Sequence, residues 1–370
     1  MKTIILSLLL ISQAVFSQEL ALVKKDDKFG YISKSGEFVI QPKFLKAKSF
    51  SEGLAGVFEN GKWGFINPKG ETVIAPVFDA VSFFKSGLCY VMTGKDWSYI
   101  NEKVTKVKMP TFEKYYEFDG GLALVESNQK WGLINPKGEV VVAPKYQFIR
   151  AFENGFARVS LNDKWGMIDK KGKLVIENVY DDLGQYYKNV TWAEKGKEYG
   201  LITNGKFTPI SGAERIWDFS DDGLAYARKD KKIGFIDITG KWVIEPKYDR
   251  AKDFVNGLAP VAVQGKWGYI NSSGVVVVAP KYTDAEIFSA DGLAPVKEMK
   301  WGFINEKGQL VIPEKYDISP AFAFLGNRKN SKGFIDGLAR VKNDKTWGFI
   351  DTKGNLLGNQ WFENAELFSK

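Results

Sequence analysis

The chain has 370 residues, of which 52 are basic and 44 acidic, so it carries a formal net charge of +8 with both signs mixed. It has no histidine and a single cysteine, Cys89. These counts remove the commonest general base and the commonest metal ligand, and they exclude a disulfide framework or a cysteine-based zinc site within one chain. A hydrophobic content of 44% with 14% aromatic residues indicates a folded protein, because disordered chains are poor in apolar residues.

Residues 1–17 predict a secretory signal peptide. Lys2 gives a positive start, residues 4–16 are mostly apolar, and Ser17 ends a short cleavage site before Gln18. The apolar stretch is too short to span a bilayer well, and no later segment is apolar enough to cross one. We therefore expect the mature chain to be exported, to the periplasm or the cell exterior, with no transmembrane segment.

Residues 18–370 repeat with a period of 34 residues. The period is clearest at the glycine of a Trp-Gly pair or its equivalent, which falls at Gly30, Gly64, Ser98, Gly132, Gly166, Gly200, Gly234, Gly268 and Gly302. Only the last step, to Gly348, is longer, by twelve residues. A fixed period of this kind indicates one supersecondary unit used ten times.

Four segments make up each unit. They are Gly-Leu-Ala followed by alternating residues (as in 53–57), Lys-Trp-Gly-Phe-Ile-Asn (62–67), Gly-x-x-Val-Ile-x-Pro (70–76) and Tyr-Asp-x-Ala-x-x-Phe (248–254). Each is short, rich in β-branched and aromatic residues, and bounded by turn residues, which is typical of strands. No helical periodicity is sustained over a helix length. The sequence therefore predicts an all-β fold with three or four short strands in each unit.

The architecture of the array follows less directly from the period. One unit buries too little surface to stand alone, so neighbours must stack. Because β-propellers typically close with four to eight blades, ten units favour an open, curved superhelix of hairpins; a β-propeller-like ring, or two rings, is the alternative. The register slips at residues 177–215, which fits a break between two halves of five units or simple drift in one unit. The array ends at Phe368, in the slot of the fourth segment's aromatic residue, so we expect ten whole units.

Together these motifs resemble the WG-repeat, or KWG-repeat, proteins of bacteria. The resemblance covers residues 19–370 and is specific because the motif recurs ten times. It implies a repeat architecture and no general catalytic chemistry. This chain departs from the pattern at Ser98, at residues 177–215 and in the long last interval.

Three kinds of recurring residue are candidates for function, and each also has a structural interpretation. The tryptophans could stack on sugars or bases, but Ile233 fills the same slot and favours a core role. The lysines could form basic columns that attract anionic polymers, or a solvated exterior that protects strand edges. The Tyr-Asp aspartates could be catalytic acids, but one in each unit suits a turn hydrogen bond better. These residues are Trp63, Trp97, Trp131, Trp165, Trp267, Trp301 and Trp347; Lys62, Lys130, Lys164, Lys232, Lys266 and Lys300; and Asp79, Asp181, Asp249 and Asp317.

Two single features are weaker candidates. The segment from Asp218 to Gly223 resembles the opening of a calcium loop, but Lys229 stands where an EF-hand requires glutamate. Cys89 occupies the alanine slot of Gly-Leu-Ala, where a small, buried and inert thiol is expected.

The unique element of the array is an insertion at residues 318–336. Insertions in repeat arrays map to loops on one face, often the binding face. Its apolar run and basic tip make the following residues candidate partner contacts: Phe322, Phe324, Arg328, Lys329 and Lys332. The alternative is a small hairpin that caps the end of the array.

From these observations we predict an exported, non-enzymatic repeat protein that binds a macromolecular partner through its extended surface. The partner is expected to be a protein or an anionic cell-envelope glycan and not a nucleic acid, and no cofactor or metal is expected. The alternatives are an enzyme that hydrolyses glycans with two carboxylates in a groove, and a purely structural spacer in the envelope.

Overall fold

A computed structural model of the protein describes residues 18–319 and 332–370. The predicted signal peptide at residues 1–17 and four of the candidate contacts, Phe322, Phe324, Arg328 and Lys329, lie outside these residues. No helix in the described part of the chain has the length and the hydrophobicity needed to cross a membrane.

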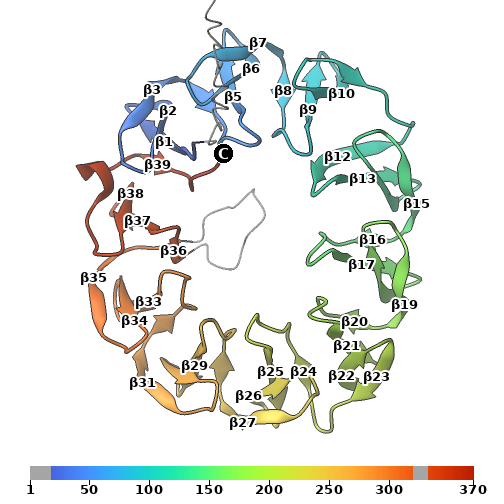
Figure 1. The fold of residues 1–370 in the computed structure, drawn as a ribbon, viewed down its shortest axis with the longest axis vertical. Coiled ribbons are helices and arrows are strands. Elements are labelled where there is room, and N and C mark those ends of the chain that lie inside the picture. The colour runs from blue at the N-terminus through green and yellow to red at the C-terminus, as the bar shows by residue number, and fades with distance from the viewer. Residues whose placement is uncertain (1–17, 320–331) are drawn as a thin grey trace, which may run out of the picture.

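The described chain forms one closed ring of ten small antiparallel sheets, so the fold is a ten-bladed β-propeller (Figure 1). The all-β prediction is confirmed, whereas the open superhelix is wrong and the ring alternative is correct. The chain passes through the irregular stretch 177–215 as blade 6 of the same ring, so there is no break into two halves. Below, blade 1 contains β1–β3, the next blades follow in chain order, and blade 10 contains β36–β38.

Each blade places its four segments in a fixed order from the central opening to the periphery (Figure 1). In nine blades the innermost strand, mostly two residues long, comes from the Tyr-Asp-x-Ala segment: β4 (Lys46–Ala47), β8 (Ala80–Val81), β12 (Lys114–Asp119), β16 (Phe148–Ile149), β20 (Asp182–Leu183), β24 (Arg215–Ile216), β28 (Arg250–Ala251), β32 (Asp284–Ala285) and β39 (Asn364–Ala365). In blade 10 the innermost strand is β36 (Phe334–Ile335), which lies at the end of the insertion, while Asp317 of the segment forms a separate bridge with Lys342. The second strands come from the Gly-Leu-Ala segment: β1 (Ala21–Lys25), β5 (Ala55–Glu59), β9 (Leu88–Thr93), β13 (Leu122–Ser127), β17 (Phe156–Leu161), β21 (Val190–Lys195), β25 (Leu224–Lys229), β29 (Leu258–Val263), β33 (Leu293–Lys297) and β37 (Leu338–Asn343).

The two outer positions of each blade hold the remaining segments. The third strands carry the Trp-Gly pair: β2 (Lys28–Ile32), β6 (Lys62–Ile66), β10 (Asp96–Asn101), β14 (Lys130–Ile134), β18 (Lys164–Asp169), β22 (Glu198–Thr203), β26 (Lys232–Asp237), β30 (Lys266–Asn271), β34 (Trp301–Asn305) and β38 (Thr346–Asp351). The outer strands are β3 (Phe38–Phe44), β7 (Thr72–Phe78), β11 (Lys106–Val107), β15 (Val140–Tyr146), β19 (Leu174–Tyr180), β23 (Lys206–Pro209), β27 (Trp242–Tyr248), β31 (Val276–Tyr282) and β35 (Leu310–Tyr316); in blade 10 the single-turn 3-10 helix η1 (Leu357–Asn359) follows β38 instead.

The Trp-Gly glycine is required because the outer strand passes directly over it. A Cβ atom on Gly64 would lie 2.5 Å from the carbonyl oxygen of Ile74, and one on Gly268 would lie 2.3 Å from that of Val278. The register between the third and outer strands shifts at this point, as between Trp63 and Phe65 in blade 2. Bulges of this kind let two backbones approach closely where no side chain intervenes.

The hydrophobic core lies between neighbouring blades. At seven of the junctions an aromatic ring of the third strand packs against a phenylalanine in or just after the innermost strand of the next blade, with ring centres 4.7–5.1 Å apart. Phe50, Phe84, Phe254 and Phe288 are at most 1% exposed in these positions. Because each blade can bury this ring only against a neighbour, closing the ring completes the core.

The ring closes by pairing the two ends of the described chain. The last strand, β39, pairs antiparallel with β1, at Val23↔Ala365 and Lys24↔Asn364. Leu20 and Ser369 exchange two further backbone hydrogen bonds of 2.9 and 3.0 Å. The sheet of blade 1 is therefore built from both ends, and Figure 1 shows this seam beside the C-terminus.

Candidate binding site

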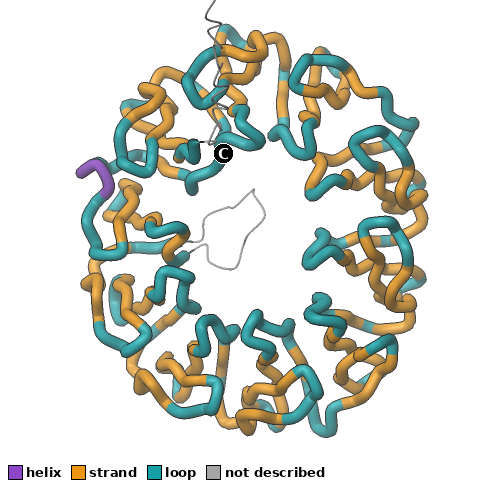
Figure 2. Tube along the Cα trace, viewed as in Figure 1, coloured by secondary structure: helices purple, strands orange, loops and turns teal. Residues whose placement is uncertain are grey.

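The central opening is bordered by tight turns that join the innermost strand of each blade to the Gly-Leu-Ala strand (Figure 2). In blade 2, Glu52 and Gly53 both have positive φ angles, of 51° and 79°, and Ser86 and Gly87 repeat this in blade 3 with 58° and 75°. Two successive positive φ angles define a type I′ turn, which favours glycine at its second position. The glycine of Gly-Leu-Ala is thus a turn residue, and we call this series of turns the inner rim.

Neighbouring turns of the inner rim are hydrogen-bonded to one another. The Glu52 carboxylate accepts bonds from the backbone N–H groups of Ser86 at 2.6 Å and Gly87 at 2.8 Å. The Ser86 hydroxyl accepts a bond of 3.0 Å from the N–H of Gly121. On the far side of the ring, the Asp222 carboxylate accepts a bond of 3.0 Å from the N–H of Gly257. A spacing of 34 or 35 residues therefore brings equivalent turns into contact, and these bonds link the turns of blades 2, 3 and 4 and those of blades 7 and 8.

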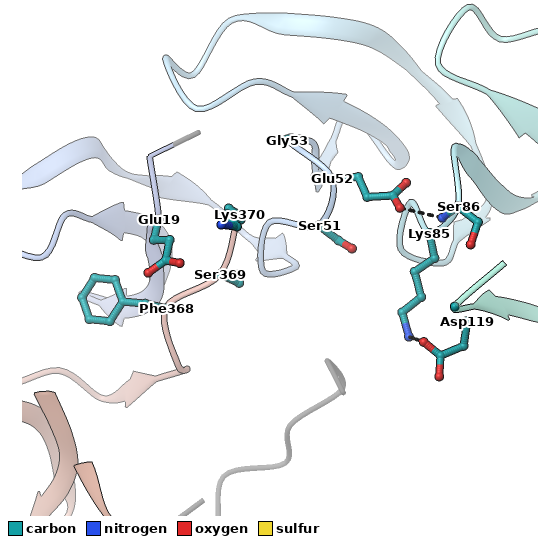
Figure 3. A pocket seen from close by; sticks show the side chains of 11 residues that line it. Glu19, Ser51, Glu52, Gly53, Lys85, Ser86, Asp119, Phe368, Ser369 and Lys370 are labelled. Carbon is teal, nitrogen blue, oxygen red and sulfur yellow. Dashed lines mark hydrogen bonds and ion pairs between the residues drawn. The ribbon is translucent and has the colours of Figure 1, made fainter. Parts of the chain in front are cut away.

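A hollow of about 760 Å³ opens on the inner rim at the seam (Figure 3). We call it the seam hollow. It is lined by both chain ends and by the turns of blades 2, 3 and 4, through Glu19, Ser51, Glu52, Gly53, Lys85, Ser86, Asp119, Gly120, Phe368, Ser369 and Lys370. Its volume falls in the range of small-ligand pockets, and one side is the mouth of the central opening, so a chain segment of a larger partner can enter it.

Each carboxylate of the seam hollow already has a partner within the protein. Glu19 pairs with Lys34 at 2.6 Å, Glu52 holds the turn of blade 3, and Asp119 lies 3.9 Å from the Lys85 ammonium. Two catalytic carboxylates would instead have to face each other across the substrate. Among residues 18–319 and 332–370, no group of three or more His, Cys, Asp and Glu side chains is arranged to hold a metal ion.

The recurring aspartates serve as clasps between blades. Asp79 accepts a hydrogen bond of 2.5 Å from the Lys62 ammonium in its own repeat and one of 2.7 Å from the N–H of Gly94 in the next blade. Asp181 and Asp249 repeat both bonds, and Asp317 repeats the ion pair with Lys300 at 2.5 Å. The turn interpretation is confirmed for Asp79, Asp181 and Asp249, and each lysine of these pairs has its charge offset by an aspartate.

The aspartate clasps predict a loss of stability in acid. The lysine hydrogen bond, followed by the backbone hydrogen bond, lowers the pKa of Asp79, Asp181 and Asp249 below the ordinary value of 3.8. A depressed folded-state pKa stabilises the fold above the unfolded-state pKa, and this stabilisation is lost as the pH falls through the folded-state value. We expect the melting temperature to drop below about pH 4, and to drop less in the triple variant Asp79→Asn, Asp181→Asn, Asp249→Asn.

Melting curves between pH 6 and pH 2.5 measure this effect. Asp96→Asn changes an exposed aspartate that belongs to no clasp, and it should keep the wild-type pH dependence. Identical acid dependence in the wild type and the triple variant would contradict the assignment.

Most Trp-Gly tryptophans belong to the packing between strands. Trp267 and Trp301 are 6% and 5% exposed, and Ile233 in the same slot is 6% exposed, so the core interpretation is confirmed there. Several indoles are also covered by a cation of the same chain: Arg340 lies 4.3 Å from the ring centre of Trp347, Lys252 5.1 Å from that of Trp267 and Arg150 5.3 Å from that of Trp165. Trp97 is the exception at 46% exposed, and it stacks on Tyr90.

The remaining candidates also have structural partners. Asp218 accepts hydrogen bonds of 2.8 Å from the Trp192 indole and from the N–H of Gln185. Cys89 is buried, which raises the pKa of its thiol to about 12 and keeps it protonated, as expected of an inert side chain. Lys332, the one candidate contact within the described residues, lies 2.5 Å from the Glu286 carboxylate and over the Trp301 ring.

Sequence reasoning did not find the seam hollow. Its residues come from three neighbouring turns and both chain ends, and they are brought together only by closure. The available signal was the position in the repeat at which the array starts and stops. It starts with a Gly-Leu-Ala strand that lacks an innermost strand, and it stops with an innermost strand that lacks a Gly-Leu-Ala strand.

Comparison with known proteins bears on the family and the fold. The profile described as "WG containing repeat" matches residues 29–63, 63–96, 97–131, 131–165, 165–199, 233–267, 267–298 and 301–322. Comparison with curated proteins yields no match.

Among solved structures, similarity is found to a crystal structure of a eukaryotic initiation factor, with a TM-score of 0.47 and 11% identity over 95% of this chain and 97% of that chain. Hsv2p of Kluyveromyces lactis gives a TM-score of 0.29 and 7% identity over 61% of this chain and 92% of that one. The structure of YCF48 bound to a D1 peptide gives a TM-score of 0.29 and 15% identity over 72% of this chain and 95% of that chain. These scores bear on neither activity nor partner. The family profile, in contrast, covers more than half of the chain in eight repeats, and the chain therefore belongs to the WG containing repeat family.

Proposed function

We propose that this protein is an exported, non-enzymatic scaffold that binds a partner protein on its inner rim, at the seam hollow. The observation that carries the proposal is the hollow itself, an opening of about 760 Å³ beside the hydrogen-bonded turns of blades 2, 3 and 4. A rigid, preformed surface loses little conformational entropy on binding. Its mixture of turn backbone, an aromatic ring and side chains of both charges suits a polypeptide segment.

The non-enzymatic part of the proposal is supported by how the acids are used. The carboxylates of the hollow and the recurring aspartates hold turns and blades together. A cell-envelope glycan is the second candidate partner, favoured by a hydroxyl-lined hollow on the outer side of the ring. Export is inferred from residues 1–17 alone, and the contacts at Phe322, Phe324, Arg328, Lys329 and Lys332 stay predictions.

Charge reversal on the rim tests the proposal. Mature wild-type protein and Asp119→Arg, which changes an exposed side chain of the hollow, are immobilised and exposed to cell-envelope extract, and the captured proteins are quantified by mass spectrometry. We expect one protein to be captured by the wild type and to be reduced about tenfold or more on the variant, because a like-charged contact at an interface is costly.

Asp96→Arg is the matched control, since it makes the same substitution at an exposed position in a hairpin outside the rim. Equal capture by all three proteins would refute binding at the seam hollow. Formation of product from a panel of envelope glycans incubated with the wild type would refute the non-enzymatic assignment.

A further inference from the structure

A second hollow, of about 420 Å³, lies at the outer side of the ring between blades 6 and 7. We call it the outer hollow. It is lined by Leu201, Thr203, Thr208, Pro209, Ile210, Ser211, Lys229, Thr239, Gly240 and Trp242. It belongs to the part of the ring where the repeat is least regular, and residues 200–232 are not covered by the family profile.

The outer hollow exists because the outer strand of blade 6 stops early. β23 has four residues where β19 and β27 have seven, and it pairs with β22 without a register shift. The chain then turns at Ile210, whose carbonyl accepts a bond of 3.1 Å from the N–H of Ala213. At regular junctions the Asn-Pro-Lys-Gly type of turn packs on the preceding outer strand, as Gly274 does on Ile244. Here Gly240 meets Ile210 beyond the strand, and the remaining space is open.

The lining has unused hydrogen-bonding capacity. The Thr203, Thr208 and Ser211 side chains are exposed and make no hydrogen bond to any other part of the described chain. The Lys229 side chain is half-buried, with its stem beside Gly212, and its ammonium forms no ion pair with residues 18–319 or 332–370. Trp242 is also half-buried, and it packs on one side against the cluster around Leu201.

This set of groups matches a sugar that carries an acid. A pyranose ring has an apolar C–H face, which an indole can cover, and a rim of hydroxyls, which pair with side chains that both donate and accept. An ammonium without an ion-pair partner at the wall of a hollow favours an anionic ligand, because its hydrogen bonds to a carboxylate are charge-assisted. The volume lies within the range of small-ligand pockets and fits one or two sugar units.

We propose that the outer hollow binds a hexuronic acid unit of an acidic glycan, with Lys229 on the carboxylate, Trp242 against the ring and the three hydroxyl side chains on the sugar hydroxyls. This binding is independent of a partner protein at the inner rim, because the two hollows share no residue. The chemistry is recognition alone, and no bond is made or broken.

Titration of the mature protein with D-glucuronate, D-glucose and acetate tests the proposal. Binding is measured by calorimetry and by the indole N–H signals in NMR spectra, where the Trp242 signal is identified by its loss in Trp242→Phe. We expect glucuronate to shift that signal and to bind about tenfold more tightly than glucose, since a charge-assisted hydrogen bond adds to the shared contacts. Acetate should neither shift it nor compete.

Substitutions separate the contributions. Lys229→Met should lower the affinity for glucuronate about tenfold and leave the affinity for glucose unchanged, while Trp242→Phe should lower the affinity for both sugars. Lys137→Met and Trp97→Phe are the matched controls, at an exposed turn lysine and an exposed tryptophan of other blades, and both should bind like the wild type. Unchanged glucuronate affinity in Lys229→Met, or acetate competing as well as glucuronate, would overturn the assignment; circular dichroism verifies that each variant is folded.

Discussion

Deletion of residues 364–370 is expected to open the ring and to lower the free energy of unfolding by on the order of 5 kcal/mol. The deletion removes β39, the two bonds between Leu20 and Ser369, and the bond of 2.8 Å from the Glu366 N–H to the carbonyl of Leu22. It also removes Ala365, which is fully buried, and Phe368, whose ring packs 4.9 Å from that of Phe349. The edge of β1 and the core between blades 1 and 10 are left exposed to water.

The deletion is checked by thermal unfolding and by small-angle scattering, which detects the expected increase in radius. Removal of Lys370 alone is the control, because its exposed side chain forms none of these contacts and the loss should be close to neutral. If the truncated protein had the same melting temperature and the same radius as the full-length protein, β39 would not be what holds the ring closed.

Gly268→Ala is expected to destabilise the protein by about 3 kcal/mol, at the upper end of the usual cost of overpacking. The new methyl group would lie 2.3 Å from the carbonyl oxygen of Val278 and 2.7 Å from the nitrogen of Pro280. Both atoms belong to the backbone of the outer strand, so the strand itself must move and the bulge that it makes over Trp267 is disrupted. Chemical denaturation of the purified variant measures the loss.

Gly333→Ala is the matched control for this substitution. There the nearest atoms to the new Cβ, on Pro295 and Ser289, are 3.8–3.9 Å away, which is ordinary contact, so little change is expected. Repeat 3 is a natural test of the same argument. Its Ser98 replaces the glycine, and its outer strand β11 is only two residues long and pairs no further back than Tyr99. Equal stability of the two glycine variants would contradict the close-approach explanation.

Much of the local structure could be predicted from the sequence. The 34-residue period, the strand segments and the turns that bound them follow from composition and spacing, because they depend on interactions within one repeat. The departures from the repeat pattern were also visible in the sequence: Ser98 lies in the blade with the short outer strand β11, and residues 177–215 contain the short outer strand β23.

Closure could not be predicted in the same way. Whether ten units form a ring depends on the small rotation between successive blades, which is set by packing at each junction and accumulates over the whole array. The clue lay in the phase of the ends, where Leu20 begins a Gly-Leu-Ala strand and Phe368 fills the aromatic slot of an innermost strand. We interpreted this pattern as ten whole units in an intact array. In the structure, the first blade lacks an innermost strand of its own, and the final segment of the array supplies it. The seam hollow depends on closure of the ring and the outer hollow on one shortened strand, so neither could be predicted from a local motif.

The pairing of β1 with β39 also dictates an order of events during synthesis. β1 is made long before its partner β39, so its edge stays unpaired while the intervening blades are produced. Contacts between residues so distant in the sequence form late, since the intervening chain must first become compact. An unpaired edge is a site of aggregation. A chain that lacks β39 is therefore left with an exposed β1 edge that favours aggregation.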